Sequence, residues 1–394
     1  MGTKAWPRIA AVLYAMLALS GCGLSDIRNY DAVQSVWINP MPAPDARQTV
    51  FFITDRGDAI PEKDYVFGEH WGGVPRCGQA ELKIPPTVKI GSNEPSIEAV
   101  TLEHITCKAD LPALTGRLAA PASQKDCGKR VLLFIHGYNN IFRTGLLRAG
   151  QVAHDLDWPC PVILFDWTSA GQIDRYAADA ERSAYAIPLL TQLLAQLNAD
   201  GFKVQILAHS MGNRVLLGAV APTCVPTAPH VAAQVMLAAP DVGAETATLT
   251  EKRSDGIARD HNNDDFLKLI TLSAPCFDRV TLYTSDNDIA LMTSETAHGG
   301  IPRAGRQPAI SRDYPKTVTN MDVVDASQAP AGSAGHGYYS LSWETVKDMK
   351  QVLAGKVPAD RATLQAVDGS YVLAVSPDRR PSIRFRLYRQ LWPH

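Results

Sequence analysis

The chain between residues 131 and 326 alternates between two hydrophobic patterns. Short continuous apolar runs are typical of strands buried on both faces of a sheet. They occur at VLLFIHG (131–137), PVILFDW (161–167), FKVQILAH (202–209), AAQVMLAAP (232–240), DRVTLYTS (278–285) and, more weakly, TNMDVVDA (319–326). Between them, apolar positions three or four residues apart predict helices, the longest over 179–201 with Gly201 as its C-cap. We therefore expect an α/β fold with a mostly parallel, doubly wound sheet.

The two flanks of this region are less regular. Upstream, the pattern predicts a strand over Thr49–Arg56, loops over 57–97 and a second strand over Ile97–Cys107. A linker is predicted over Pro112–Ser123. The two strands form an expected N-terminal strand extension. Downstream, YVLAV (371–375) and SIRFRLYRQ (382–390) flank the turn-like SPDRRP, which predicts a C-terminal β-hairpin.

The first residues have the pattern of a secretory signal. Lys4 and Arg8 precede an apolar run from Ile9 to Leu19, which is shorter than the roughly 20 apolar residues that span a bilayer. The run ends in LSGC, which resembles a bacterial lipobox and implies cleavage before Cys22 and lipidation of Cys22. Because Gly23 rather than Asp follows, we expect an anchored protein of the outer membrane that faces the periplasm; a soluble secreted protein is the alternative.

Composition excludes some classes of partner and cofactor. The formal net charge of -2 provides no field that would recruit nucleic acid, so none is expected. Six cysteines remain besides Cys22, an even number that fits disulfides in an oxidising compartment, with buried free thiols as the alternative. They show no CxxC spacing, and we expect neither a metal nor another cofactor.

Three polar residues follow predicted strands in an order that suggests nucleophilic catalysis. Ser210 ends the 202–209 strand, Asp288 follows the 278–285 strand and His336 follows the 319–326 strand. Parallel strands present their carboxyl ends at one edge of a sheet, where sites form. A serine needs an imidazole to take its proton, and the imidazole needs a carboxylate to orient it. Serine, acid and histidine in this chain order are typical of α/β-hydrolases.

The residues around Ser210 fit a strained nucleophile turn. Gly212 is the small residue expected two positions after the serine, whereas Ala208 stands where the general pattern has glycine. We expect the backbone N–H of Met211 to form half of an oxyanion hole, with Gly137 or Tyr138 of HGYNN (136–140) as the other donor. Ser210 as an ordinary helix N-cap is the alternative.

Other residues compete for the acid and base roles. Asp286 lies two residues before Asp288, and Asp241 ends the preceding strand, so either is an alternative acid. His298 is an alternative base, although it follows the acid too soon for another strand to intervene. Three further residues follow the end of the 161–167 strand, which are Trp167, Tyr176 and Asp179. We expect them either to line the pocket or to order the loop.

Taken together, these pieces resemble a bacterial α/β-hydrolase family of unknown function, many of whose members are predicted lipoproteins. The matching stretches include VFFITDR, VLLFIHGYNN, LFDWTSAG, LAHSMGNRVL, LAAPDV, LYTSDNDIAL and GHGYYS, which span residues 50–340. The resemblance implies the α/β-hydrolase fold and a triad of Ser210, Asp288 and His336, but no substrate.

With that fold, the chain divides into four segments. We expect a signal peptide over 1–21, a lipidated tether over 22–48, a hydrolase domain over 49–345 and a C-terminal helix and hairpin over 346–394. The cysteines that precede neighbouring strands predict disulfides, which are Cys127–Cys160, Cys224–Cys276 and, in the N-terminal region, Cys77–Cys107.

The resulting functional hypothesis is an envelope-anchored serine hydrolase. It would act as an esterase, lipase or thioesterase on a small-molecule or lipid ester, through an acyl-enzyme on Ser210. A catalytically silent α/β-hydrolase scaffold, acting as an envelope binding or assembly partner, is the alternative. The intact serine, histidine and acid favour the enzyme.

Overall fold

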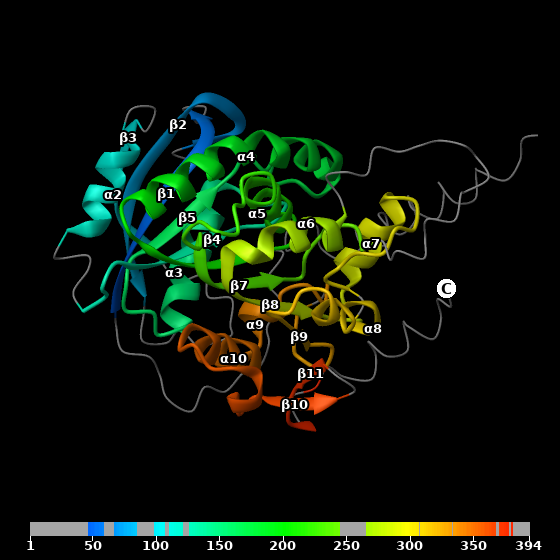
Figure 1. Ribbon diagram of the computed structural model, residues 1–394. Helices are drawn as coiled ribbons and strands as arrows, with labels where there is room; N and C mark the ends of the chain where they lie inside the picture. The colour runs from blue at the N-terminus through cyan, green and yellow to red at the C-terminus, as the bar shows by residue number, and fades with distance from the viewer. Residues whose placement is uncertain are drawn as a thin grey trace, which may run out of the picture.

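A single mixed sheet forms the centre of the structure (Figure 1). The computed structural model describes residues 46–58, 67–84, 98–106, 110–120, 126–244, 265–306, 308–332, 334–367, 370–377 and 380. The described strands form an eleven-stranded sheet in the order β10-β11-β9-β8-β7-β6-β4-β5-β1-β2-β3. All neighbours from β11 to β1 are parallel, and the pairs β1–β2, β2–β3 and β10–β11 are antiparallel. The expected mostly parallel, doubly wound sheet is therefore confirmed.

The strands have the following bounds: β1 Ala46–Asp58, β2 Phe67–Ile84, β3 Glu98–Thr106, β4 Arg130–Ile135, β5 Val162–Asp166, β6 Lys203–His209, β7 Ala232–Ala238, β8 Phe277–Thr284, β9 Met321–Asp325, β10 Leu364–Val367 and β11 Ser370–Leu373. The helices are α2 Leu111–Ala119, α3 Phe142–Asp155, α4 Tyr176–Ala199, α5 Gly212–Val220, α6 Phe266–Ser273, α7 Ile289–Ala297, α8 Pro308–Ser311, α9 Tyr338–Leu341 and α10 Trp343–Leu353. Single 3-10 turns occur at Ile173–Arg175, Ala274–Cys276, Tyr314–Lys316 and Pro358–Asp360.

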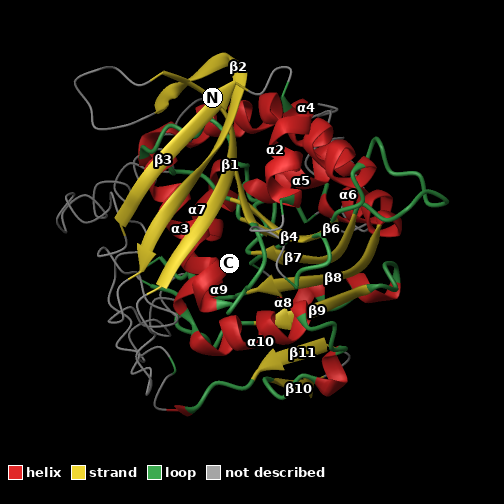
Figure 2. Ribbon diagram, turned by 90° about the vertical axis from the view of Figure 1, so that its left-hand side faces the viewer, coloured by secondary structure: helices red, strands yellow, loops and turns green. Residues whose placement is uncertain are grey.

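Helices cover both faces of the sheet and bury two apolar layers. Residues of α2, α4, α5 and α6 pack on one face, and those of α3, α9 and α10 pack on the other (Figures 1 and 2). Successive residues of β6 belong to opposite layers, since Ile206 faces the first and Leu207 the second. This double burial explains why the central strands are continuous apolar runs in the sequence.

The N-terminal extension contains a strand that the sequence did not predict. The expectation of loops over 57–97 is wrong for Phe67–Ile84, which forms β2 between β1 and β3. Only its second half alternates clearly, with Ala80, Leu82 and Ile84 buried, and its first half is partly exposed. Residues 76–83 of β2 pair with β1 on one edge and with β3 on the other, and this long-range pairing outweighs the low strand propensity of their charged residues.

Two other expectations are corrected in the segments that flank the central parallel strands. The linker expected over Pro112–Ser123 is wrong for its first part, because α2 begins at Leu111, with proline in the helix's first turn and Leu114 and Leu118 buried. At the C-terminus a hairpin is present, but β11 pairs with the preceding β10 and, on its other edge, with β9. The predicted partner segment 382–390 lies outside the described residues. The predicted domain boundary after residue 345 falls within α10.

Disulfides join neighbouring strands at the amino edge of the sheet. Cys127–Cys160 links the segments that enter β4 and β5, and Cys224–Cys276 links the segments before β7 and β8. Both are pairings that the sequence predicts. Cys77 is also disulfide-bonded; its predicted partner, Cys107, lies outside the described residues, as does Cys22.

Removal of one of these disulfides should destabilise the fold. The Cys127–Cys160 bond closes a loop with a sequence separation of 33 residues. Loop-closure entropy then predicts that Cys127→Ser/Cys160→Ser loses about 4 kcal/mol of unfolding free energy. Urea unfolding without reductant measures this, and reduced wild type, which loses all disulfides, is the comparison. An unchanged urea midpoint in the double variant would contradict the stabilising role.

Candidate active site

Ser210 occupies a strained turn between β6 and α5. Its φ of 53° is in the left-handed region, which non-glycine residues rarely adopt. The backbone N–H of Ser210 donates to the carbonyl of Ala238 in β7 (2.9 Å), and its own carbonyl accepts from the amides of Asn213 (3.1 Å) and Asp241 (3.2 Å). Contacts on both sides therefore hold the turn in a conformation that costs about 1–3 kcal/mol by itself.

Small residues let the strand, the turn and the neighbouring loop approach closely. A Cβ on Gly212 would lie 2.5 Å from the carbonyl oxygen of His136, and one on Gly137 would lie 2.7 Å from Cβ of Ser210. Both distances are shorter than real Cβ contacts allow. Ala208 is fully buried, so its methyl group is accommodated in the place where the general pattern has glycine. The HGYNN loop thus lies directly against Ser210.

His136 and Asn140 fix the orientation of this loop. The carbonyl oxygen of Gly137 lies 2.7 Å from Nδ1 of His136 and accepts a hydrogen bond from Nδ2 of Asn140 (3.1 Å). Because C=O and N–H of a trans peptide point in opposite directions, the N–H of Tyr138 points away from the side chains of His136 and Asn140. Met211 is the N-cap of α5, and the first N–H groups of a helix have no intrahelical acceptor.

His336 and Asp288 form a buried pair. Nδ1 of His336 lies 2.6 Å from Oδ2 of Asp288, and the second carboxylate oxygen accepts from the amide of Leu291 (2.9 Å) at the start of α7. Burial raises the pKa of Asp288, although the neighbouring His336 opposes this shift. Gly335 makes the approach possible, since its φ is 67° and a Cβ would meet the carbonyl oxygen of Asn287. The His336 ring lies 4.6 Å, centroid to centroid, from His209, the residue before Ser210.

The alternative acids have other partners. Asp241 accepts hydrogen bonds from Ser294 (2.6 Å), Arg303 (2.8 Å) and Tyr176 (2.5 Å). Burial disfavours its charge, but Arg303 and Arg214 outweigh burial and hold the pKa of Asp241 well below its ordinary value. Asp286 is half-buried, and its amide donates to Ser327. The structure therefore places Asp288, of the three carboxylates considered, against His336.

The alternative base belongs to the Asp241 cluster. Nε2 of His298 lies 3.3 Å from Nη2 of Arg214, and its Nδ1 lies 2.8 Å from the carbonyl oxygen of Ser294. Burial and the charges of Arg303 and Arg214 lower the pKa of His298. The ring nitrogens of His298 thus contact Arg214 and Ser294, and Asp241 acts on the ring only as a nearby charge.

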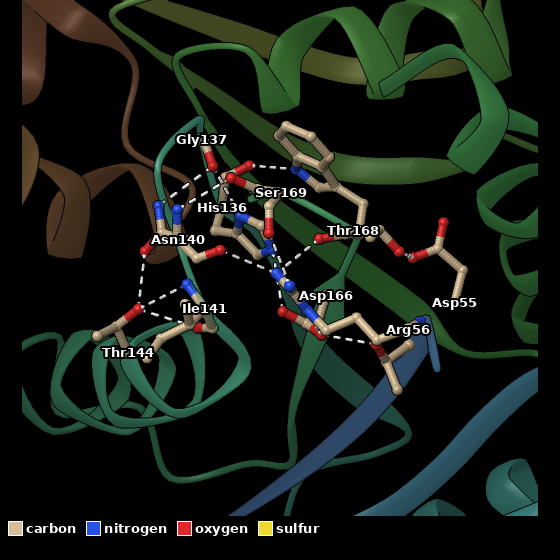
Figure 3. Close-up of polar contacts among 12 residues, drawn as sticks. Asp55, Arg56, His136, Gly137, Asn140, Ile141, Thr144, Asp166, Thr168 and Ser169 are labelled. Atoms are coloured by element: carbon tan, nitrogen blue, oxygen red, sulfur yellow. Dashed lines mark hydrogen bonds and ion pairs between the residues drawn. The ribbon is translucent and has the colours of Figure 1, made fainter. Parts of the chain in front are cut away.

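A buried ionic network that the sequence analysis missed supports the HGYNN loop (Figure 3). Arg56, at the end of β1, and Asp166, at the end of β5, are both fully buried and paired at 2.7 Å. Asp166 also accepts from Thr54 (2.6 Å), and its other oxygen lies 3.1 Å from Nε2 of His136. Burial favours the neutral acid, but Arg56 and His136 hold the pKa of Asp166 below its ordinary value.

The remaining donors of Arg56 bind the backbone of three segments. Its two terminal nitrogens donate to the carbonyl oxygens of Gly68 (3.3 Å), Ser169 (2.7 Å), Asn140 (2.9 Å) and Trp167 (2.9 Å). Together with the bond to Asp166, this uses all five N–H groups of a guanidinium. Arg56 therefore joins β2, the loop after β5 and the HGYNN loop. Charged residues at the ends of two adjacent buried strands were the signal that could have revealed this network.

Trp167 and Asp179 contact the loops after β4 and β5. Trp167 is fully buried, stacks on His136 and donates from Nε1 to the carbonyl of that residue (2.8 Å). Asp179 accepts from the hydroxyl of Ser169 (2.5 Å) and the amide of Ala170 (2.8 Å). Tyr176 is half-buried and packs against Tyr138 at 5.3 Å between ring centroids.

Among the described residues, no group of three or more His, Cys, Asp or Glu side chains is arranged to hold a metal ion. In the same part of the chain, no helix combines the length and apolarity needed to cross a membrane.

The strand order and the position of the serine turn in the middle of the sheet are those of the α/β-hydrolase fold. Residues 118–356 match the family described as "Alpha/beta hydrolase of unknown function (DUF900)", and the chain belongs to this family. Among solved structures, the peroxisomal alpha-beta-hydrolase Lpx1 of Saccharomyces cerevisiae is similar, with 10% identity, a TM-score of 0.33, and coverage of 88% of this chain and 96% of that chain. No curated protein matches the sequence.

Substitution of Asp166 tests the network. Asp166→Asn keeps the side-chain volume but leaves the Arg56 charge buried without its carboxylate, so we expect a loss of about 3–5 kcal/mol of unfolding free energy at pH 7. Because the pKa of Asp166 is lowered on folding, its stabilisation is present above the ordinary value of 3.8 and is lost as pH falls below it. The difference between variant and wild type should therefore shrink in acid.

Urea unfolding at pH 7 and at pH 3 measures both effects. Asp278→Asn is the matched control, since Asp278 is paired with His230 but its side chain is 56% exposed; its effect should be below about 1 kcal/mol. Equal urea midpoints for the Asp166 and Asp278 variants would contradict the role given to the network.

Proposed function

We propose that this α/β-hydrolase is a serine hydrolase that cleaves carboxylic esters through an acyl-enzyme on Ser210. The observation that carries the proposal is the buried His336–Asp288 pair, with 2.6 Å between Nδ1 and Oδ2, packed beside the residue that precedes a left-handed serine. The family match supports a hydrolase in general. The ester substrate and the acyl-enzyme are the proposal.

In the proposed reaction, His336 accepts the proton of Ser210 while the serine oxygen attacks the ester carbonyl. Asp288 keeps the proton on Nδ1, so that Nε2 is the basic nitrogen, and stabilises the imidazolium that forms. The imidazolium then protonates the departing alkoxide, and the acyl group remains on Ser210. Water, deprotonated by His336, hydrolyses the acyl-enzyme and restores the serine.

Two backbone amides stabilise the charge on the carbonyl oxygen in this mechanism. Met211 provides one N–H at the start of α5, where the helix dipole also favours an anion. Since the hydrogen bonds to the carbonyl of Gly137 direct the next amide away from His136 and Asn140, we assign the second donor to Tyr138 rather than to Gly137. The side chain of Tyr138 is tied back, because its hydroxyl donates to the carbonyl of Ile173.

Labelling with a fluorophosphonate probe tests the nucleophile. Wild type should become labelled at Ser210, and Ser210→Ala should lose labelling and about 10⁴-fold or more of any esterase kcat. Ser273→Ala is the matched control, because its hydroxyl is buried and bonded within α6. If wild type stays unlabelled while a control esterase reacts, the chain is better interpreted as a catalytically silent scaffold.

Asparagine substitutions distinguish the acids. Asp288→Asn should lower kcat by about 10³–10⁴-fold, because the imidazole loses its orienting carboxylate. Asp241→Asn should instead reduce stability, since Arg303 is fully buried beside it, and should leave kcat of the folded protein within about tenfold of wild type. Kinetics and melting curves of the two variants measure this split, and the reverse result would assign the acid to Asp241.

We further propose that a lipid on Cys22 anchors the protein to the outer membrane, with lipid or small-molecule esters as substrates. The support is the sequence pattern alone, because residues 1–45 lie outside the described residues. In a bacterial host, wild type should incorporate an alkyne-labelled fatty acid and fractionate with membranes. Cys22→Ala should do neither, and membrane retention of Cys22→Ala would contradict the proposal.

A further inference from the structure

His209 is a buried imidazole that the proposed reaction does not use. It ends β6, directly before Ser210, and is 8% exposed. A buried polar side chain costs free energy unless it is hydrogen-bonded, and an apolar residue would continue the strand equally well. A histidine at this position therefore indicates a polar contact that an apolar side chain could not make.

The ring of His209 contacts the loop that carries the proposed base. Its Nε2 lies 3.3 Å from the carbonyl oxygen of His336, and its ring lies 4.6 Å, centroid to centroid, from the ring of that residue. On another side it stacks on Tyr339 of α9 at 4.2 Å. His336 itself lies between two glycines outside any helix or strand, so its position depends on such contacts.

The same ring lies close to Gly137 of the HGYNN loop. A Cβ built on Gly137 would lie 3.1 Å from Nδ1 of His209. Burial and the nearby His336 lower the pKa of His209 well below its ordinary value, so the ring is neutral and has one N–H. Because a carbonyl oxygen can only accept, we assign that hydrogen to Nε2, which leaves Nδ1, on the side of Gly137, unprotonated.

We propose that His209 is a positioning residue, which ties the His336 loop to the strand of the nucleophile by the hydrogen bond from Nε2 to the carbonyl of His336. The role rests on the proposed function, since it acts through His336. Loss of the bond lets the imidazole of His336 move relative to Ser210. A displacement of about 1 Å at a reacting group can lower the rate by about 100-fold.

Two substitutions separate the hydrogen bond from packing. His209→Phe keeps an aromatic ring against Tyr339 but has no donor, and His209→Gln keeps a donor without the ring. Steady-state hydrolysis of a short p-nitrophenyl ester and the rate of fluorophosphonate labelling are measured. We expect His209→Phe to lower kcat and the labelling rate by about 10–100-fold with KM within about twofold, and His209→Gln to restore both to within about fivefold of wild type.

The controls distinguish this inference from the proposed function. His154→Phe is the matched variant, because His154 lies on α3 beside Asp155, and it should leave kcat unchanged. Melting temperatures establish that each variant is folded. Wild type must first react with the probe, and its failure to do so overturns the proposed function. Where wild type reacts, a folded His209→Phe with wild-type kcat, or equal losses in Phe and Gln variants, overturns the role of the hydrogen bond.

Discussion

The buried pairing of Arg56 with Asp166 is the interaction on which the architecture of the site depends. Burial of a guanidinium with no exposed surface costs least free energy when every donor is satisfied. Arg56 meets this condition by binding one carboxylate and four backbone carbonyls. Because those groups belong to β5, β2 and two loops, satisfying the charge also fixes the loops relative to one another. Asp166 also contacts Nε2 of His136, and Nδ1 of His136 contacts the carbonyl of Gly137. The constraint therefore reaches the HGYNN loop.

This constraint makes the close approach at the serine turn possible. Gly137 and Ser210 lie so near each other that a single methyl group on Gly137 would collide with the side chain of the serine. Such proximity requires a loop that does not relax away, and the network provides one. The serine turn is held equally firmly from β7, through the bond from its amide to Ala238. Ser210 keeps its strained left-handed conformation because contacts on both sides of the turn hold it there.

The carboxyl and amino edges of the parallel sheet carry different features. At the carboxyl edge lie the serine turn, the His336–Asp288 pair and the loops that the ionic network orders. At the amino edge, the two fully described disulfides join adjacent strand entries. Covalent cross-links thus stabilise the fold away from the region where side chains must approach one another closely. The edge that carries the candidate chemistry is held by hydrogen bonds and burial instead.

The sequence by itself determined the central parallel strands, the order of Ser210, Asp288 and His336, and the pairing of Cys127 with Cys160 and of Cys224 with Cys276. The strands follow from apolar runs, which are a local property, whereas the disulfide pairings also use the sheet order of the α/β-hydrolase fold that the motifs resemble. Only the tertiary structure decided that 67–84 is a strand and that β10 is the partner of β11, because pairing partners lie far away or have no local signature.

Tertiary structure alone also decided which carboxylate lies beside which base. Asp288, Asp286 and Asp241 all follow strand ends, and spacing does not distinguish them. The distinction comes from the side chains that other segments bring near, His336 to Asp288 and Arg303 to Asp241. The role of Arg56 could not be predicted from the sequence either, because the groups that bind its buried guanidinium come from separate parts of the chain. Electrostatic partnership depends on distance in space, which a strand pattern does not encode.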